Sequence, residues 1–508
     1  MFHPAPTLLR AAPEAPGPDA EAPRDVDRAG LAVLALAVGV HLWLCWWLRG
    51  FITDDSWISV RYAENLASGA GFVWNPGGPR AEGFSNPLLV LVEALADRAG
   101  WSAMAAARTL GVLSSLACLV LVHVRGPAVL GRAATRAALL LTACCAPFAL
   151  WAVGGLETAL VAVVLTAGVL ELSRCGGGRP VAAAAALAVL PWLRPEGLAV
   201  AAAVAGLSEL PGLLRRRTRG AALRRTAVLA GLPLASQAVL EALRLGLYGH
   251  LLPNSVLYKS GTGDTFAVLG KFAGQASLVL VLAAVGLLVV RGRARLLAVA
   301  PAVYVAGSIG TLDSANAHSR FFMPVWPLLA LLAGAAVVAL AGLARGRLRG
   351  AVAVVAAGAA AGVLLVQPPA DPASVRAWHE RYTDCRVDAR EDVATWLRAT
   401  PPGTSFAISD AGLVPARAGG REAVDSFFLN DPLIQETGPL PFRERAALVH
   451  ERSPDVLVLV SREADRFEAG YPTDGAIHDS PAMAAYSLAH VGSGTGASCG
   501  YHLMVFTR

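Results

Sequence analysis

The sequence predicts a polytopic α-helical membrane protein of about 11 spans, followed by a C-terminal α/β domain. Three observations carry this prediction. The 508 residues are 55% hydrophobic and only 16% charged, which is less charge than a soluble protein usually carries. Apolar runs long enough to span a bilayer recur through the first two thirds of the chain. After residue 367 the charge rises and helix-like and strand-like patterns alternate.

Hydropathy places the predicted spans in a membrane domain over residues 29–367. They lie near residues 29–48, 103–124, 137–153, 156–172, 180–193, 196–211, 226–244, 275–290, 295–311, 321–344 and 350–366. Residues 1–28 are rich in Pro, Ala and acidic residues and lack the features of a signal peptide. We expect them to form a disordered cytoplasmic tail.

The short loops between the spans sort by charge. One set is rich in Arg and nearly free of acidic residues, which predicts the cytoplasmic side by the positive-inside rule. Its members are Arg125, Arg132, Arg136, Arg174, Arg179, Arg215, Arg216, Arg217, Arg219, Arg224, Arg225, Arg291, Arg293, Arg295, Arg345, Arg347 and Arg349. The other set carries the carboxylates and faces outward. This orientation predicts a plasma-membrane protein with a cytoplasmic N-terminus, and it explains the pI near 9.1 without nucleic-acid binding.

Residues 368–508 are predicted to form the extracytoplasmic α/β domain. The stretch "DVATWLRAT" has helical spacing, whereas "SFAIS", "DVLVLVS" and "YHLMVFT" are typical of short buried strands. Cys385 and Cys499 are the two cysteines in this part of the chain. An oxidising compartment favours a disulfide between them, with two unpaired thiols as the alternative.

The first outer loop, residues 49–102, holds the adjacent carboxylates Asp54 and Asp55 at the start of the amphipathic segment "DDSWISVRYAENLASG". A helix cap is the simple explanation of one Asp. It does not explain both, because only one residue can be the N-cap and neighbouring helical positions point about 100° apart. We expect one carboxylate to cap or orient and the other to face a reactive site. Glu82 and Asn86 follow in the same loop, where loop packing is the alternative to substrate binding.

Two further outer loops supply candidate substrate-binding residues. The stretch "LLPNSVLYKSGTGD" contains Asn254, Tyr258 and Lys259, and a Lys beside a Gly-rich bend can hold a phosphate. The stretch "HSRFFMP" contains His318 and Arg320. Arg320 opens an apolar span, so snorkelling to the interface is its alternative role.

Carboxylates, a Lys and an Arg at membrane depth suit sugar transfer from a polyprenyl phosphate. One carboxylate serves as general base for the acceptor hydroxyl, and cations stabilise the departing phosphate. No ligand spacing demands a metal, although Asp54 or Asp55 could hold a divalent cation. Local geometry slightly favours Asp54 as the base, because Asp55 is the more natural cap.

Several stretches together resemble the GT-C superfamily of integral-membrane glycosyltransferases, and the actinobacterial terminal arabinofuranosyltransferase-like group within it. They are "TDDSWISVRYAENLASGAGFVWNPGGPRAEGFSNP", "GGLET", "RPEG", "LLPNSVLYKSG", "SRFFMPVWPLL" and "ISDAGLVPARAGGREAVDSFFLNDPLI". The resemblance implies decaprenyl-phosphate sugar donors and a catalytic acid in the first outer loop. It favours Asp55 as the base and Asp54 as its orienting or metal-binding neighbour, with Lys259 and Arg320 on family positions. Ala416 stands where the family usually has Tyr, which leaves the acceptor open.

The favoured function is therefore transfer of a sugar, arabinofuranose or another pentose or hexose, from a polyprenyl-phosphate donor to a cell-envelope glycan. A non-catalytic membrane protein whose outer domain binds a glycan or a protein partner is the alternative. A transporter is less favoured, because the spans carry few charges near their centres.

Overall fold

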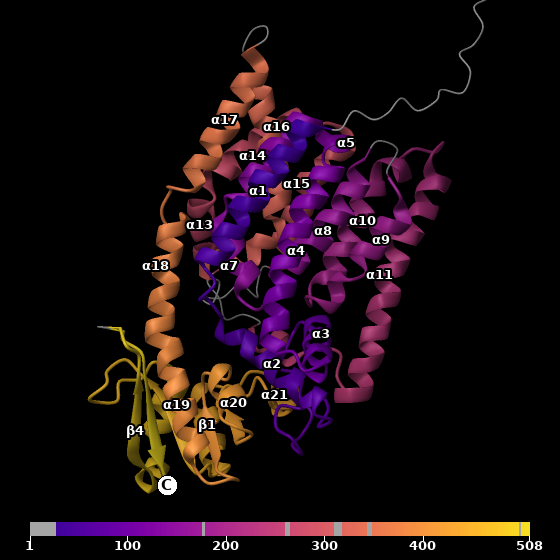
Figure 1. Cartoon of the computed structure of the whole chain (residues 1–508). Coiled ribbons are helices and arrows are strands. Elements are labelled where there is room, and N and C mark those ends of the chain that lie inside the picture. The colour runs from indigo at the N-terminus through magenta and orange to yellow at the C-terminus, as the bar shows by residue number, and fades with distance from the viewer. Residues whose placement is uncertain (1–26, 175–177, 260–264, 309–316, 343–347, 497–498) are drawn as a thin grey trace, which may run out of the picture.

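The computed structural model describes residues 27–174, 178–259, 265–308, 317–342, 348–496 and 499–508. A tall bundle of helices stands on a small domain of mixed helices and strands, and the two are in contact (Figure 1). Most of the predicted N-terminal tail lies outside the described residues. The helix α5, which lies within the Arg-rich loops, is at the opposite end of the bundle from the sheet (Figure 1).

Most elements of the chain up to residue 364 are helices of the bundle. They are α1 Arg28–Trp47, α4 Ala103–Arg125, α5 Pro127–Leu130, α6 Arg132–Ala143, α7 Ala146–Val153, α8 Thr158–Ser173, α9 Pro180–Leu187, η2 Leu190–Trp192, α10 Gly197–Leu214, α11 Arg219–Tyr248, α12 Asn254–Lys259, α13 Thr265–Gln275, α14 Ser277–Val289, η3 Gly292–Arg295, α15 Leu296–Ser308, η4 Ala317–Val325, α16 Trp326–Ala341 and α17 Leu348–Leu364.

Within the described residues, five helical segments are long and apolar enough to cross a bilayer, and two bent pairs raise this to seven. The bent pairs are α6 with α7, at 61°, and α13 with α14, at 86°. Three shorter apolar helices lie over α8, α9 with η2, and the second part of α17. These elements overlap predicted spans. The total of about 11 membrane spans stays a prediction. In the span His318–Ala341, 94% of the most apolar 18-residue window is buried, so its apolar character on every side fits a central helix.

The first outer loop folds into two helices, α2 Asp54–Ala67 and α3 Pro87–Arg98. The N-cap of α2 is Thr53, whose side chain makes no capping hydrogen bond. The capping role considered for one carboxylate is therefore wrong, because both lie in the first turn of the helix rather than at its cap. Negative charge in that turn is still favourable to the helix dipole.

The C-terminal domain contains a five-stranded sheet in the order β2-β1-β3-β5-β4. The strands are β1 Ser405–Ile408, β2 Glu422–Asp425, β3 Val456–Ser461, β4 Ser487–Ser493 and β5 His502–Thr507. The helices are α18 Pro372–Tyr382, η5 Thr383–Val387, α19 Asp388–Ala399, α20 Leu413–Arg417, α21 Leu433–Thr437, α22 Phe442–Glu451, α23 Pro472–His478 and η6 Pro481–Ala485. β1 is parallel to both β2 and β3, whereas β5 is antiparallel to β3 and β4.

The first outer loop and the C-terminal domain share one hydrophobic core. Trp57, Tyr62 and Trp74 of the loop belong to the same cluster as Phe406 and Val458 of the sheet. Alternate strand residues, such as Leu457, belong to a second cluster on the other face, as the two-residue period of a strand requires. The loop is thus packed as part of the C-terminal domain, although hundreds of residues separate them in sequence.

Polar contacts reinforce this packing at the edge of the sheet. The Asn75 side chain donates to the carbonyl of Ala423 at 2.9 Å and accepts from its backbone N–H at 3.1 Å. It therefore covers part of the free edge of β2, which would otherwise expose unpaired backbone groups. Arg61, buried beside Trp74, donates to the carbonyls of Trp74 and Pro415.

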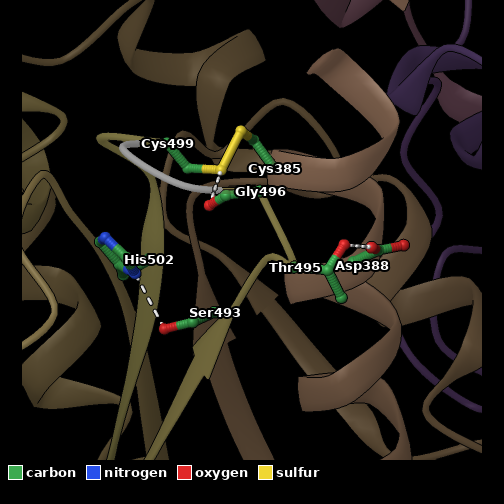
Figure 2. The surroundings of a disulfide bond; sticks show 7 residues. All are labelled: Cys385, Asp388, Ser493, Thr495, Gly496, Cys499 and His502. Carbon is green, nitrogen blue, oxygen red and sulfur yellow. Dashed lines mark hydrogen bonds between the residues drawn. A yellow bond between two sulfur atoms is a disulfide. The ribbon is translucent and has the colours of Figure 1, made fainter. Parts of the chain in front are cut away.

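Cys385 and Cys499 form a disulfide with a Cα–Cα distance of 5.2 Å. Cys385 lies in η5, a π-helical turn between α18 and α19, and Cys499 precedes β5 (Figure 2). Thr495 donates to Asp388 at 2.6 Å beside the bridge (Figure 2). The bridge joins the first helices of the domain to its last strand.

Removing this bridge should destabilise the C-terminal domain. The closed loop has a sequence separation of 114 residues, and loss of a native disulfide typically costs about 2–5 kcal/mol of unfolding free energy. We expect the double variant Cys385→Ser/Cys499→Ser to unfold at lower denaturant than the oxidised wild type, and reductant to bring the wild type to the level of the variant. Recovery of unlinked peptides of residues 385 and 499 from oxidised protein by mass spectrometry would contradict the bridge.

Candidate active site

Asp54 is held by the C-terminal domain. Its Oδ1 accepts from the backbone N–H of Leu413 at 2.9 Å, and its own backbone N–H donates to the Tyr382 hydroxyl at 3.1 Å. The guanidinium of Arg390 lies 3.5 Å from Oδ1. Gly412 packs so closely on Asp54 that a Cβ would overlap its carbonyl oxygen and its carboxylate. Asp54 is therefore fixed by contacts from three directions.

Arg390 lies between Asp54 and a second carboxylate, Asp410. It donates to Asp410 Oδ2 from Nη2 at 2.7 Å and from Nε at 3.2 Å. The hydroxyl of Tyr501 also donates to Asp410 Oδ2, and that of Tyr471 donates to Oδ1 at 3.0 Å. Arg390 is only 2% exposed, and a buried guanidinium needs such partners to offset the loss of water.

The network shifts the pKa values of Asp54 and Asp410 in opposite directions. Burial raises the pKa of Asp54 above its ordinary value, and Arg390 only partly offsets that effect. Burial would also raise the pKa of Asp410, but Arg390 and the Tyr501 hydrogen bond reverse this, so its pKa is lowered. Asp410 is thus the more firmly ionised carboxylate of the two. Nearby, burial raises the pKa of Asp425 to about 6.

Asp55 is one residue further on and has a different environment. Its Oδ2 accepts from Arg320 Nη1 at 2.7 Å. The Asp55 side chain is 41% exposed, against 15% for Asp54. Arg320 itself lies against the rings of Trp151 and Phe321. Arg320 therefore orients Asp55, and Asp55 is the more exposed carboxylate of the pair.

A cavity of about 490 Å³ opens on one side of the Asp pair. We call it the aromatic cavity. Its lining includes the rings of Phe84, Tyr258, Phe427, Phe442 and Tyr471, the carboxylates of Asp54, Asp55, Glu157, Asp410 and Asp425, and the arginines Arg320 and Arg445. The first outer loop and the C-terminal domain supply most of the wall.

A second cavity, of about 680 Å³, also borders the Asp pair. We call it the basic cavity, because Lys271, Arg381, Arg386 and Arg390 line it. Rings of Phe51, Trp151, Trp378 and Tyr382 and the disulfide complete much of the wall. Asp54, Asp55, Asp410 and Tyr471 line both cavities. The Asp pair therefore stands in the partition between a cationic and an aromatic space.

The structure brings four further predicted residues to these cavities. Asn86 and Tyr258 line the aromatic cavity, Arg320 lines it beside Asp55, and His318 lines the basic cavity. Asn86 accepts from Ser59 at 3.0 Å and donates to Glu157 at 2.9 Å. His318 packs edge-on against Trp378 with ring centroids 4.7 Å apart. The Lys259 side chain lies outside the described residues.

Glu82 and Asn254 line neither cavity, contrary to the substrate-binding role predicted for them. Both Glu82 oxygens accept from Arg244, at 3.0 and 3.1 Å, in a buried pair. The Asn254 side chain donates to the carbonyls of Leu429 and Asp431, each at 2.9 Å. Glu82 thus joins the first outer loop to α11 of the bundle, whereas Asn254 joins its own loop to the C-terminal domain.

The sequence prediction did not include Arg390, Asp410, Lys271, Arg381 or Arg386. Asp410 could have been identified from the sequence, because it follows a buried strand of the kind that forms parallel sheets. Ligand sites of parallel sheets lie beyond the carboxyl ends of the strands, and β2 also ends at the cavity with Asp425. Arg386 had no signal, since the π-helical turn that places it is not visible as a periodicity.

A divalent cation at the Asp pair fits the described residues poorly. They contain no group of three or more His, Cys, Asp or Glu side chains able to hold a metal ion. Each carboxylate of the pair is already next to an arginine. A metal role for Asp54 or Asp55 stays a prediction, and no chemical step is assigned to it.

The fold matches solved membrane proteins along most of its length. ArnT from Cupriavidus metallidurans, in a structure described as bound to undecaprenyl phosphate, aligns with a TM-score of 0.56 at 14% identity, over 94% of this chain and 97% of that one. An oligosaccharyltransferase from Archaeoglobus fulgidus, in a complex with zinc and sulfate, aligns with a TM-score of 0.50 at 16% identity, over 92% and 72%. The chain has the GT-C fold.

Two further similarities were found. The mycobacterial arabinofuranosyltransferase AftD aligns over 93% of this chain and 39% of its own, at 18% identity with a TM-score of 0.49. A family model described as a domain of unknown function, DUF8728, matches residues 376–501. No curated protein matches the sequence. The DUF8728 match coincides with most of the C-terminal domain, whose Leu413 donates to Asp54.

Replacing Gly412 by Ala should disturb the site through Asp54. The added methyl group would overlap backbone and carboxylate atoms of Asp54, and such overpacking typically costs about 1–3 kcal/mol. We expect Gly412→Ala to unfold at lower denaturant than the wild type. Gly246→Ala is the control, because a Cβ at that position of α11 meets nothing within 4 Å. Equal stability of the two variants would show that Asp54 is not packed in this way.

Proposed function

We propose that the chain is a glycosyltransferase that moves a sugar from a polyprenyl-phosphate donor to a glycan acceptor, with Asp55 as the general base. One observation carries the proposal. The reachable carboxylate of Asp55 lines two cavities of opposite character, one cationic and one aromatic. A transferase that joins two substrates needs two such spaces meeting at one reactive group.

The basic cavity suits the donor. Lys271 comes from α13 of the bundle, whereas Arg381 and Arg386 come from α18 and η5 of the C-terminal domain. Arg381 and Arg386 form no ion pair with another described residue, so their charge is available to a phosphate. The rings of Phe51 and Trp151, with centroids 5.4 Å apart, offer an apolar wall to the lipid. ArnT, which shares the fold, has been crystallised with undecaprenyl phosphate.

The chemistry requires one proton transfer and one substitution. Asp55 accepts the proton of an acceptor hydroxyl, and that oxygen forms a bond to the anomeric carbon of the donor sugar. The bond between the anomeric carbon and the phosphate oxygen breaks, and its electron pair leaves with the polyprenyl phosphate. Lys271, Arg381 and Arg386 stabilise the negative charge on that phosphate. Arg320 holds the Asp55 carboxylate in the partition between the two substrates.

The sugar and the location are proposed from the resemblance in sequence. The motifs of the first outer loop favour arabinofuranose or another pentose or hexose, carried on decaprenyl phosphate, and a glycan of the cell envelope as acceptor. The Arg-rich loops favour a plasma-membrane protein with the Asp pair on the outer face.

Asp55→Asn should abolish transfer without unfolding the protein. Loss of a general base typically lowers the rate about 10²–10⁴-fold, and the exposed side chain contributes little packing. Asp54→Asn should instead lower stability, by about 1–3 kcal/mol, because it removes a buried partner of the C-terminal domain. The measurements are transfer of labelled sugar from decaprenyl-phospho-arabinofuranose and other polyprenyl phosphosugars, and denaturant unfolding. Glu64→Gln, an exposed change on α2, is the control.

Near-normal transfer by Asp55→Asn would overturn the assignment of Asp55 as the general base. Absence of transfer by the wild type from every donor tested would overturn the enzyme assignment and leave a non-catalytic protein whose cavities bind a glycan or a partner.

The basic cavity can be tested separately through its cations. We expect Arg386→Gln and Lys271→Gln to raise KM for the donor, each by about 10-fold or more, since a charge-assisted contact to phosphate contributes about 1.5–3 kcal/mol. KM for the acceptor should change little. Arg376→Gln, on α18 but paired with Glu380 at 2.6 Å, is the matched control. A rise in the KM for the acceptor alone would show that the basic cavity binds the acceptor rather than the donor.

A further inference from the structure

Arg445 is a charged residue of the aromatic cavity that the proposed chemistry does not use. It lies on α22 of the C-terminal domain and lines the cavity. Its Nε and Nη1 atoms are buried and have no hydrogen-bond partner. No carboxylate of a described residue lies within ion-pair distance of its guanidinium.

The other charged groups of this cavity all have partners among the described residues. Asp55 pairs with Arg320, and Asp54 and Asp410 lie against Arg390. The remaining two are also satisfied: Glu157 pairs with Arg194 at 3.0 Å, and Asp425 accepts three hydrogen bonds from Phe427 and Asn430. Arg445 thus leaves an unmatched positive charge on the cavity wall.

Two aromatic rings hold the guanidinium of Arg445 in place. It lies 5.5 Å from the ring centroid of Phe427 and 5.9 Å from that of Tyr258, distances at which cation–π attraction operates. Phe427 in turn meets Tyr471 with centroids 5.4 Å apart. Tyr471 donates to Asp410 in the partition beside Asp55. A row of rings therefore leads from the reactive carboxylates to Arg445.

This arrangement is costly without a ligand and suited to an anionic one. Buried guanidinium N–H groups that lack an acceptor lose their hydration without compensation. Arginine presents its N–H groups as a planar fork that matches phosphate and carboxylate oxygens. Side-chain packing alone would account for the rings around Arg445 but not for its unmatched charge.

We propose that the acceptor is an anionic sugar compound, whose phosphate or carboxylate group binds Arg445 while a hydroxyl further along it reaches Asp55. The inference rests on the proposed function, because it names the class of substrate for the aromatic cavity. The row of rings separates the anion from the reacting hydroxyl, so the charge is on a part of the acceptor that does not react.

Direct binding tests this inference without requiring transfer. Full-length protein in detergent is titrated with glucose 6-phosphate, glucuronate and the neutral methyl α-glucopyranoside. We expect at least one anionic sugar to bind about 10- to 100-fold more tightly than the neutral one. Arg445→Gln should remove that difference, and Arg445→Lys should keep part of it. Arg443→Gln, an exposed change on the same helix, should bind as the wild type does.

The outcomes separate the two anions and the two cavities. Preference for glucose 6-phosphate assigns a phosphate to Arg445, and preference for glucuronate assigns a carboxylate. Equal binding of neutral and anionic sugars overturns the inference, as does anion binding that Arg386→Gln abolishes and Arg445→Gln leaves intact. Should Arg445→Gln not fold, the weakened anion preference of Arg445→Lys decides. Failure here leaves the role of Asp55 untouched, because transfer is measured independently.

Discussion

The guanidinium of Arg390, buried between Asp54 and Asp410, is the interaction on which the candidate site depends. A cation in this position has almost no water, so it requires both carboxylates and the tyrosine hydroxyls around them. One carboxylate starts the first helix of the outer loop, and the other follows the first strand of the C-terminal domain. The ion pair therefore fixes the start of α2 to the C-terminal domain. Asp55 inherits its position from this arrangement, because it is the next residue along the same helix.

The two cavities beside the Asp pair are lined by side chains of different charge. Lys271, Arg381 and Arg386 line one space, while rings and carboxylates with arginine or hydrogen-bond partners line most of the other. The partition between them is thin enough that four side chains line both. Electrostatics can thereby direct a phosphate to one side while leaving the other side suited to flat sugar faces. Arg445 differs from the other charged groups of the aromatic cavity, because it has no ion-pair partner among the described residues. The proposal of an anionic acceptor rests on this difference.

Features that depend on local pattern could be predicted from the sequence. The apolar runs located the helices of the bundle, strand patterns located the small sheet, and the distribution of cysteines identified the pair Cys385 and Cys499. The Asp pair stood out because two adjacent carboxylates exceed what one helix cap requires. The misjudged residues were polar ones in outer loops, such as Glu82 and Asn254, because sequence does not distinguish a buried structural partner from a cavity wall. Arg390 and Asp410 were missed because their significance arises only from contacts across the fold.

The contact between Asp54 and Leu413 determines how late in the synthesis of the chain the site can form. The two residues are 359 positions apart in the chain. At a synthesis rate of about 5–20 residues per second, roughly 20–70 s pass between their appearance at the ribosome. During that interval the helices enter the membrane while the first carboxylate has no arginine, no capping backbone N–H and no cavity wall. The two cavities beside the Asp pair therefore have complete walls only after the C-terminal domain has been made and docked.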